Sequence, residues 1–357
     1  MFQHNRLDSD LTFFQKLKNL DYILLISIIL LSIISVFVMY STDGGEILYH
    51  TKSHFIKLLI FFPLMLIISF FNIKFWHITS YIFYLTVIVL LIWVSIDGVK
   101  ASGSQRWIDL YFIVLQPSEL MKIAIILCLA KYYHRLKINN VNSFTNIIVA
   151  LSIITVPVTL VVSQPDLGTS ILIASSGLII LWLGGVKIKY FFISFITFLI
   201  SLPFIISFLK PYQKLRILTF LDPDRDPLGA GYQIIQSKIA IGSGGLSGKG
   251  FLKGTQSYLD FLPEKHTDFI FTLFSEEFGF VGSIILLTIF ILIIYRIVAI
   301  GNDSKNNFSK LYCYSFATAF FVYVAVNMSM VLGLLPIVGA PLPIMSYGGS
   351  SMLSIMI

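Results

Sequence analysis

Apolar runs of about 20 residues recur along this chain, and this feature constrains its fold more than any other, since a helix of that length crosses the bilayer core of roughly 30 Å. Of the 357 residues, 57% are hydrophobic and only 12% are charged, with a mean hydropathy of +0.88. Water-soluble domains contain about 45–50% apolar and about 25% charged residues. The sequence therefore predicts an all-α, polytopic membrane protein.

The apolar pattern predicts about ten membrane-spanning helices in one domain that covers residues 1–357. A long polar stretch, residues 210–267, separates the seventh run from the eighth, and we expect it to form a large extracytoplasmic loop. Within it, residues 232–241 favour a short amphipathic helix. The predicted spans lie near 22–40, 54–71, 75–96, 117–134, 144–163, 169–185, 190–209, 269–295, 312–335 and 341–357.

Lysine and arginine are unevenly distributed between the short loops. With a cytoplasmic N-terminus, the cytoplasmic loops hold twelve of these cations and the outer ones hold three, Lys52, Lys100 and Arg106. Because cytoplasmic loops are enriched in Lys and Arg, we expect both termini inside and the long loop outside. No small-residue cleavage site follows the first apolar run, which favours a retained span over a signal peptide.

Three other features exclude alternative classes. The net charge of +7 is spread between apolar runs and forms no basic stripe with aromatic residues, which argues against nucleic-acid binding. Cys128 and Cys313 lie inside apolar runs, which favours packing over a disulfide or a metal pair. The segment GSGGLSGKG (242–250) lacks the GxxxxGK[ST] spacing and a preceding strand, so we reject nucleotide binding there.

The strongest candidate site is the polar segment PEKHTD (263–268), which lies directly before an apolar run and contains Lys265, His266 and Asp268. A carboxylate at this position is expected at the outer membrane surface, near the positive end of a helix. In the alternative interpretation, Thr267 or Asp268 is an N-cap that binds the first amides of the span. The sequence leaves both interpretations open.

Two further outer segments are candidates for the same site. SGSQRWID (102–109) contains Arg106, whose fork of donors matches phosphate, and Trp107, which offers a flat apolar face. The alternative is an interfacial tryptophan beside a solvated arginine. SQPDLGT (163–169) contains Asp166, for which a helix cap is the alternative.

Glu119 and Lys122 lie inside the fourth predicted span, where their i, i+3 spacing puts them on one helical face and lets them pair. An isolated charge in hydrocarbon costs about 2.5–3.5 kcal/mol on insertion scales. We therefore expect both side chains to face a cavity or the bundle interior, as a structural or a functional pair. Glu276 and Glu277 in the eighth span raise the same question.

These segments together resemble the signature segments of the SEDS family, which includes the RodA, FtsW and SpoVE proteins. The resemblance covers essentially the whole chain in order, and GKGFLKGTQS is more similar to the RodA branch than to the FtsW branch. The segments that carry it are ASGSQRWIDL, QPSELMK, SQPDLGTS, TFLDPDRDPLGAGYQIIQSKIAIGSGG, GTQSYLDFLPEKHTDFIF, EEFGFVG and LPIVGAPLPIMSYGGSS.

The resemblance implies a ten-span peptidoglycan glycosyltransferase of the bacterial inner membrane. Such an enzyme polymerises lipid II into β-1,4-linked glycan strands during cell elongation and rod-shape maintenance. Its implied partners are a class B penicillin-binding protein, which cross-links the product, and other membrane proteins of the elongation complex. The family's functional residues fall on Asp268 (its essential aspartate), Arg106 and Trp107, the membrane pair Glu119 and Lys122, and Asp166.

An α-linked diphosphate donor and a β-linked product indicate a single inverting displacement, for which we expect Asp268 to act as general base. The sequence indicates no definite cofactor; Arg106, Lys265, other loop cations or a divalent metal are the candidates for stabilising the leaving diphosphate. The alternatives are a lipid II flippase or transporter, which buried charges favour and the lack of an internal repeat disfavours, and a non-catalytic scaffold of a cell-wall synthase.

Overall fold

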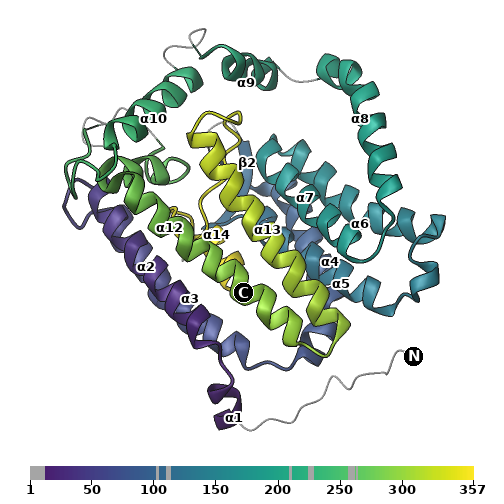
Figure 1. Ribbon diagram of the computed structural model, residues 1–357. Coiled ribbons are helices and arrows are strands. Elements are labelled where there is room, and N and C mark those ends of the chain that lie inside the picture. Colours follow the sequence, from purple (N-terminus) through teal and green to yellow (C-terminus); the bar gives the residue numbers. More distant parts are fainter. Residues whose placement is uncertain are drawn as a thin grey trace.

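The computed structural model describes residues 13–101, 104–109, 114–208, 211–223, 229–255, 262 and 264–357, and it shows a bundle of helices with one small sheet (Figure 1). Six of the described helices are long and apolar enough to cross a membrane. The prediction of a helical, multi-pass membrane protein is therefore confirmed. The six are α2 (Tyr22–Thr42), α3 (Tyr49–Ser69), α4 (Ile73–Asp97), α6 (Phe144–Ser163), α12 (Ile270–Asp303) and α13 (Asn307–Val331).

Within the described residues, nine of the ten predicted spans coincide with one helix each. Besides the six above, these are α5 (Pro117–Arg135), α7 (Leu167–Leu183) and α8 (Ile188–Phe208). The tenth predicted span, near 341–357, contains the eight-residue helix α14 (Gly349–Met356), which follows a series of turns. The number of ten membrane crossings thus stays a prediction.

The predicted long loop is partly helical. It contains α9 (Pro211–Leu221) and α10 (Ala230–Gly244), and α10 confirms the helix predicted at 232–241. Helix α9 was not expected in a stretch rich in glycine and proline. It begins at Pro211, and proline is well tolerated at a first helical position because its missing N–H would have no partner there.

Three short strands interrupt the all-α pattern between α4 and α5. They are β1 (Val99–Ala101), β2 (Ser104–Asp109) and β3 (Val114–Leu115), paired antiparallel in the order β1-β2-β3. Trp107 lies opposite Val99, and Ile108 lies opposite Leu115. The sheet therefore fixes the backbone position of the predicted site segment 104–109. Two short helices, α1 (Phe13–Lys18) and the 3₁₀ helix η1 (Ile138–Asn140), complete the described elements.

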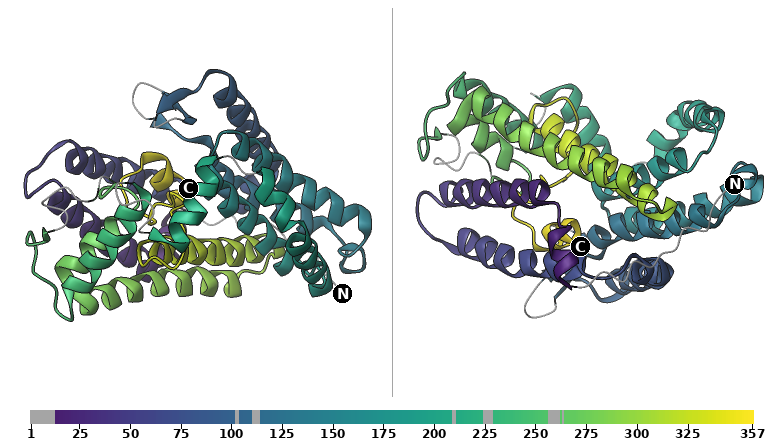
Figure 2. Two further views of the ribbon diagram at one scale, coloured as in Figure 1. Left: turned by 90° about the horizontal axis from the view of Figure 1, so that it is seen from above. Right: turned by 60° about the horizontal axis from the view of Figure 1, so that its bottom comes forward.

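Two apolar cores divide the bundle. One forms around α5, which is buried along nearly its whole length against α4, α7 and α13. The other joins α2, α3 and α14 to α12 and α13. Figure 2 shows the α2–α3 pair on one side of the molecule and α4 to α7 on the other. Peripheral helices expose large apolar side chains, as on α8, which is the surface expected of helices that face lipid.

Candidate functional site

A polar cavity of about 820 Å³ lies where the two halves of the bundle meet. Its walls come from α3, β2, the starts of α5, α7 and α14, and the segments 264–269 and 337–341. It brings together five of the residues predicted from the sequence, although these are far apart in the chain. They are Arg106, Trp107, Glu119, Asp166 and Asp268.

A smaller cavity of about 420 Å³ adjoins the first, since both share Glu264, Thr267 and Tyr347 in their walls. Of the described residues of the PEKHTD segment, the other two, Lys265 and His266, line this smaller cavity and not the larger one. The polar segment thus faces both cavities. Whether its residues bind substrate stays a prediction.

Asp268 precedes α12 without capping it. The N-cap of α12 is Phe269, which has no side-chain cap, so the N-cap interpretation of Thr267 and Asp268 is wrong. A Cβ atom added to Gly339 would lie 3.6 Å from Oδ2 of Asp268. The backbone at 339 therefore closely approaches the carboxylate in the wall of the larger cavity.

The backbone that carries Asp268 is held at three successive carbonyl groups, those of residues 266–268. They accept hydrogen bonds from the amide of Tyr347 at 2.8 Å, the hydroxyl of Ser346 at 2.6 Å and the side-chain amide of Asn327 at 2.9 Å. Asn327 is fully buried. Such backbone anchoring limits the positions open to the carboxylate, as a preorganised catalytic group requires.

Arg106 braces the turn that leads into α7. Its Nε donates to the carbonyl of Gln164 at 3.2 Å, and a terminal nitrogen donates to the carbonyl of Pro165. The other terminal nitrogen lies 3.6 Å from a carboxylate oxygen of Asp166. The alternative of a solvated arginine is therefore wrong. Two of the five N–H donors of the guanidinium are committed to carbonyls, and the others remain for Asp166 or a ligand.

Asp166 is the N-cap of α7, as its alternative interpretation predicted. Its carboxylate accepts from the amide of Thr169 at 3.2 Å and from the hydroxyl of the same residue at 2.9 Å. It also accepts from the side chain of Gln116 at 3.2 Å. The carboxylate nevertheless lines the larger cavity, so the cap and a role in the site are compatible.

Glu119 and Lys122 form an ion pair at 2.8 Å, and both residues are 4% exposed. Glu119 lines the larger cavity, while the ammonium of Lys122 lies 4.6 Å from the ring centroid of Tyr323. The expectation that the pair faces a cavity and the bundle interior is confirmed. A low-polarity environment strengthens the attraction within such a pair.

Lys57 is a cavity residue that sequence reasoning missed. It comes from α3, and its ammonium lies 3.9 Å from the ring centroid of Tyr347, which also lines the larger cavity. A lysine inside a predicted span is expensive in lipid and is itself a signal of a polar site. Lys57 is the fourth residue of the predicted span 54–71, so its position in the sequence already indicated a polar site.

Glu276 and Glu277 line neither of the two cavities. Their carboxylates instead accept hydrogen bonds from the loop at residues 249–255. Glu276 accepts from the ammonium of Lys249 at 2.7 Å and from the amide of Thr255 at 2.9 Å. Glu277 accepts from the amide of Leu252 at 3.1 Å. For these two carboxylates the geometry supports the structural interpretation.

The fold and the cavity together define a multi-pass helical membrane protein with an acidic, aromatic-lined site at the meeting of its two halves. Residues 16–357 match the family of cell cycle proteins that comprises FtsW, RodA and SpoVE, and the chain belongs to this family.

Several relatives carry functional names. Escherichia coli K12 peptidoglycan glycosyltransferase MrdB is 47% identical over 274 residues, which cover 76% of this chain and 74% of the relative. A probable peptidoglycan glycosyltransferase FtsW from Buchnera aphidicola (subspecies Schizaphis graminum) is 38% identical, covering 87% of this chain and 89% of the relative.

Solved structures show the same fold. A chain from a peptidoglycan synthase complex that coordinates polymerization and crosslinking superposes with a TM-score of 0.82 at 27% identity, covering 95% of each chain. The rod shape determining protein RodA of Thermus thermophilus gives a TM-score of 0.71 at 22% identity, covering 95% of this chain and 93% of that one.

Proposed function

We propose that this chain is a peptidoglycan glycosyltransferase that polymerises lipid II into β-1,4-linked glycan strands for cell elongation and rod-shape maintenance, with Asp268 as the general base. One observation carries the proposal. The carboxylate of Asp268, on a backbone anchored at three carbonyls, lines the same polar cavity as Arg106 and Trp107. Relatives named peptidoglycan glycosyltransferases support the reaction class.

The proposed reaction is one inverting displacement. The 4-hydroxyl oxygen of the acceptor sugar attacks the anomeric carbon of the donor, and the bond from that carbon to the diphosphate breaks. Asp268 takes the proton of the hydroxyl, while the diphosphate leaves with the bonding electron pair. A base placed in this way typically contributes 10²–10⁴-fold to a rate. The flat face of Trp107 suits an apolar sugar surface.

Charge stabilisation of the leaving diphosphate is the second requirement. The cavity wall carries five carboxylates, Asp109, Glu119, Asp166, Glu264 and Asp268, against two cations, Lys57 and Arg106. Glu119 and Asp166 have cationic partners in Lys122 and Arg106. We therefore assign Lys57 and Arg106 to the diphosphate, with Lys265 and His266 at the adjoining cavity. A divalent cation brought with the substrate would add to the stabilisation of the diphosphate.

The proposed setting is the bacterial inner membrane, with ten crossings, both termini in the cytoplasm and residues 210–267 on the outer side. The cation bias of the short loops supports this orientation. The proposed partners are lipid II, a class B penicillin-binding protein and other membrane proteins of the elongation complex. Structural similarity to a chain of a peptidoglycan synthase complex supports a partner of that kind.

The proposal is tested by incubating the purified protein with lipid II in detergent, alone and with a class B penicillin-binding protein, and resolving glycan polymers on a gel. We expect polymer from the native chain and a rate at least about 100-fold lower from Asp268→Asn, which keeps the shape of the side chain. Asp303→Asn is the matched control, since Asp303 is exposed at the far end of α12, and it should polymerise at the native rate.

Two results would contradict this proposal. An Asp268→Asn protein that keeps more than about a tenth of the native rate is not missing its general base. Failure of the folded native chain to make polymer, both alone and with its partner, would favour a lipid II transporter or a non-catalytic scaffold. Thermal unfolding of each variant shows that a lost rate is not a lost fold.

A further inference from the structure

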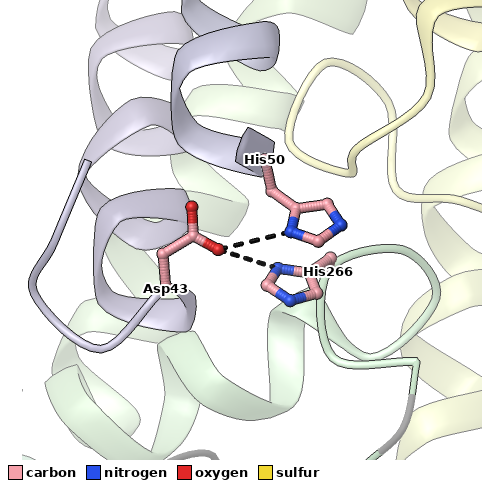
Figure 3. Close-up of side chains that lie close together, drawn as sticks. All are labelled: Asp43, His50 and His266. Atoms are coloured by element: carbon pink, nitrogen blue, oxygen red, sulfur yellow. Dashed lines mark ion pairs between the residues drawn. The ribbon is translucent and has the colours of Figure 1, made fainter. Parts of the chain in front are cut away.

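We propose that Asp43, His50 and His266 form a binding site for a first-row divalent transition-metal ion, of which Zn²⁺ is the best match. The three residues come from the end of α2, the start of α3 and the segment before α12 (Figure 3). One carboxylate oxygen and two imidazole nitrogens lie within 4.8 Å of one another. The proposed glycosyltransferase chemistry uses His266 only as a residue of the smaller cavity and gives no role to Asp43 or His50.

The two separations that involve the carboxylate are close to those of a loaded site, and all three donor atoms lie within 4.8 Å of one another. Oδ1 of Asp43 lies 3.4 Å from Nδ1 of His50 and 3.9 Å from Nδ1 of His266. Zinc bonds of about 2.0–2.1 Å in tetrahedral geometry put neighbouring donor atoms about 3.3–3.4 Å apart. The carboxylate therefore needs to move by only about half an ångström relative to His266.

The carboxylate is already oriented for this role. Oδ2 of Asp43 accepts from the amide of Thr51 at 2.8 Å and from the hydroxyl of Thr51 at 2.6 Å, and the Asp43 side chain is 2% exposed. These two bonds occupy one oxygen and leave Oδ1 directed at the two imidazoles. Hydrogen bonds that orient a ligand in this way are typical of protein metal sites.

The two imidazoles are stacked, with ring centroids 3.9 Å apart and planes 15° from parallel. One cation shared by the two rings would bind both as neutral ligands. An ion lies close to the plane of each ring that binds it, so loading requires at least one ring to tilt. His50 has room to tilt, since its side chain is 38% exposed.

Nδ1 of His266 also lies 2.9 Å from the hydroxyl of Thr42, which itself donates to the carbonyl of Met39 at 2.6 Å. Without an ion, Nδ1 of His266 is therefore the donor to Thr42. Metal binding at Nδ1 therefore requires the other neutral tautomer of the ring, in which the proton sits on Nε2, because an imidazole binds a metal through its unprotonated nitrogen.

The donor set selects the class of ion. Mg²⁺ and Ca²⁺ take oxygen ligands, whereas two imidazoles and one carboxylate suit zinc and its first-row neighbours. Three protein ligands leave at least one coordination position for water or substrate. His50 and His266 line the smaller cavity, so that position faces it. The ion also links α2 and α3 to a segment that ends at Asp268, two residues after His266.

The test measures metal content without any lipid substrate, so its outcome does not depend on the proposed polymerase activity. The full chain, purified through a histidine-free tag, is dialysed against Zn²⁺ and analysed by mass spectrometry for bound metal. We expect about one Zn²⁺ per chain, with an affinity reduced more than about 10-fold in His50→Ala and in Asp43→Asn, since even indirect changes cost 10–100-fold. Mg²⁺ should not bind measurably.

His77→Ala is the matched control, because the His77 ring also stands against a second imidazole, His134, with centroids 5.4 Å apart. It should keep the native zinc content. Hydrogen exchange gives an independent readout: zinc should slow exchange at residues 264–268 in the native chain but not in His50→Ala. The inference is overturned if the native chain retains no zinc, if His50→Ala retains as much as the control, or if Mg²⁺ binds equally well.

Discussion

At the scale of single residues, the Glu119–Lys122 pair shows how the polar cavity extends into the bundle. Glu119 faces the cavity, and Lys122 lies one helical turn deeper, beside the ring of Tyr323. The hydroxyl groups of Tyr323 and Ser176 form a hydrogen bond at 2.7 Å. The pair is therefore one end of a buried polar chain that runs from the cavity toward α7 and α13.

We predict that Glu119→Leu and Lys122→Met lower the unfolding temperature when made singly, because each leaves one buried charge without its partner. Removing one member of a buried pair typically costs about 3–5 kcal/mol, whereas replacing both with apolar residues is often neutral or better. The double variant should therefore recover stability. Thermal unfolding in detergent measures all three variants against the native chain.

The same variants separate a structural pair from a functional one. If Glu119 contacts the lipid-linked substrate, the stable double variant should still make no polymer in the lipid II assay. A double variant that is both stable and active would assign the pair to structure alone.

Single residues also show what the sequence can predict. Asp166 as a cap follows from local chain geometry, and an ion pair at i, i+3 follows from helix periodicity. In contrast, the anchoring of Asp268 by Asn327, Ser346 and Tyr347 joins segments about 60 to 80 residues apart, which no local pattern reveals. The N-cap alternative for Thr267 and Asp268 considered only the neighbouring helix, whose N-cap is Phe269.

At the scale of elements, α12 changes character at Gly279. Residues 270–277 are buried on all sides, whereas the helix after Gly279 exposes large apolar side chains from Phe280 onward. Gly279 has φ 65° and ψ −161°, a region that only glycine readily adopts. A glycine-rich loop packs into this kink: the amide of Phe280 donates to the carbonyl of Gly245 at 2.9 Å.

We predict that Gly279→Ala lowers the unfolding temperature clearly, because the strained backbone costs about 1–3 kcal/mol and a new Cβ would meet the amide of Gly248 at 2.3 Å. Gly242→Ala is the matched control. Its Cβ would meet nothing within 4 Å, and it lies in α10, so the substitution should be neutral or slightly stabilising. Equal unfolding temperatures for the two variants would contradict the role of the kink.

This loop also shows where element-level prediction stops. Nucleotide binding was rejected in this loop from the spacing of its glycines. Their structural role depends on α12, about 30 residues further along the chain: a Cβ on Gly244 would lie 2.3 Å from the carbonyl of Ser275. A close approach of two backbone segments can be predicted only when the positions of both segments are known. Likewise, strands of two or three residues such as β1 and β3 are too short for a periodicity signal.

At the scale of the whole molecule, the apolar runs predicted the helices well because lipid imposes a length and a composition on each one. The prediction of the orientation in the membrane has a weaker physical basis, since it depends on the excess of lysine and arginine in the short cytoplasmic loops. The part of α12 from Phe280 to Asp303 is long enough, at about 36 Å, to cross the hydrocarbon core. Sites just before and just after it should therefore lie on opposite sides of the membrane.

We predict that a membrane-impermeant maleimide labels Ser247→Cys in intact spheroplasts but labels Asn307→Cys only after the membrane is opened. Both positions are exposed, Ser247 in the loop packed against the α12 kink and Asn307 at the start of α13. The background replaces the native thiols Cys128 and Cys313 with alanine. The reverse pattern would invert the proposed orientation and put the cavity of Asp268 on the cytoplasmic side. Labelling of both sites in intact spheroplasts would instead mean that α12 does not cross the membrane, and the ten-span proposal would fail with it.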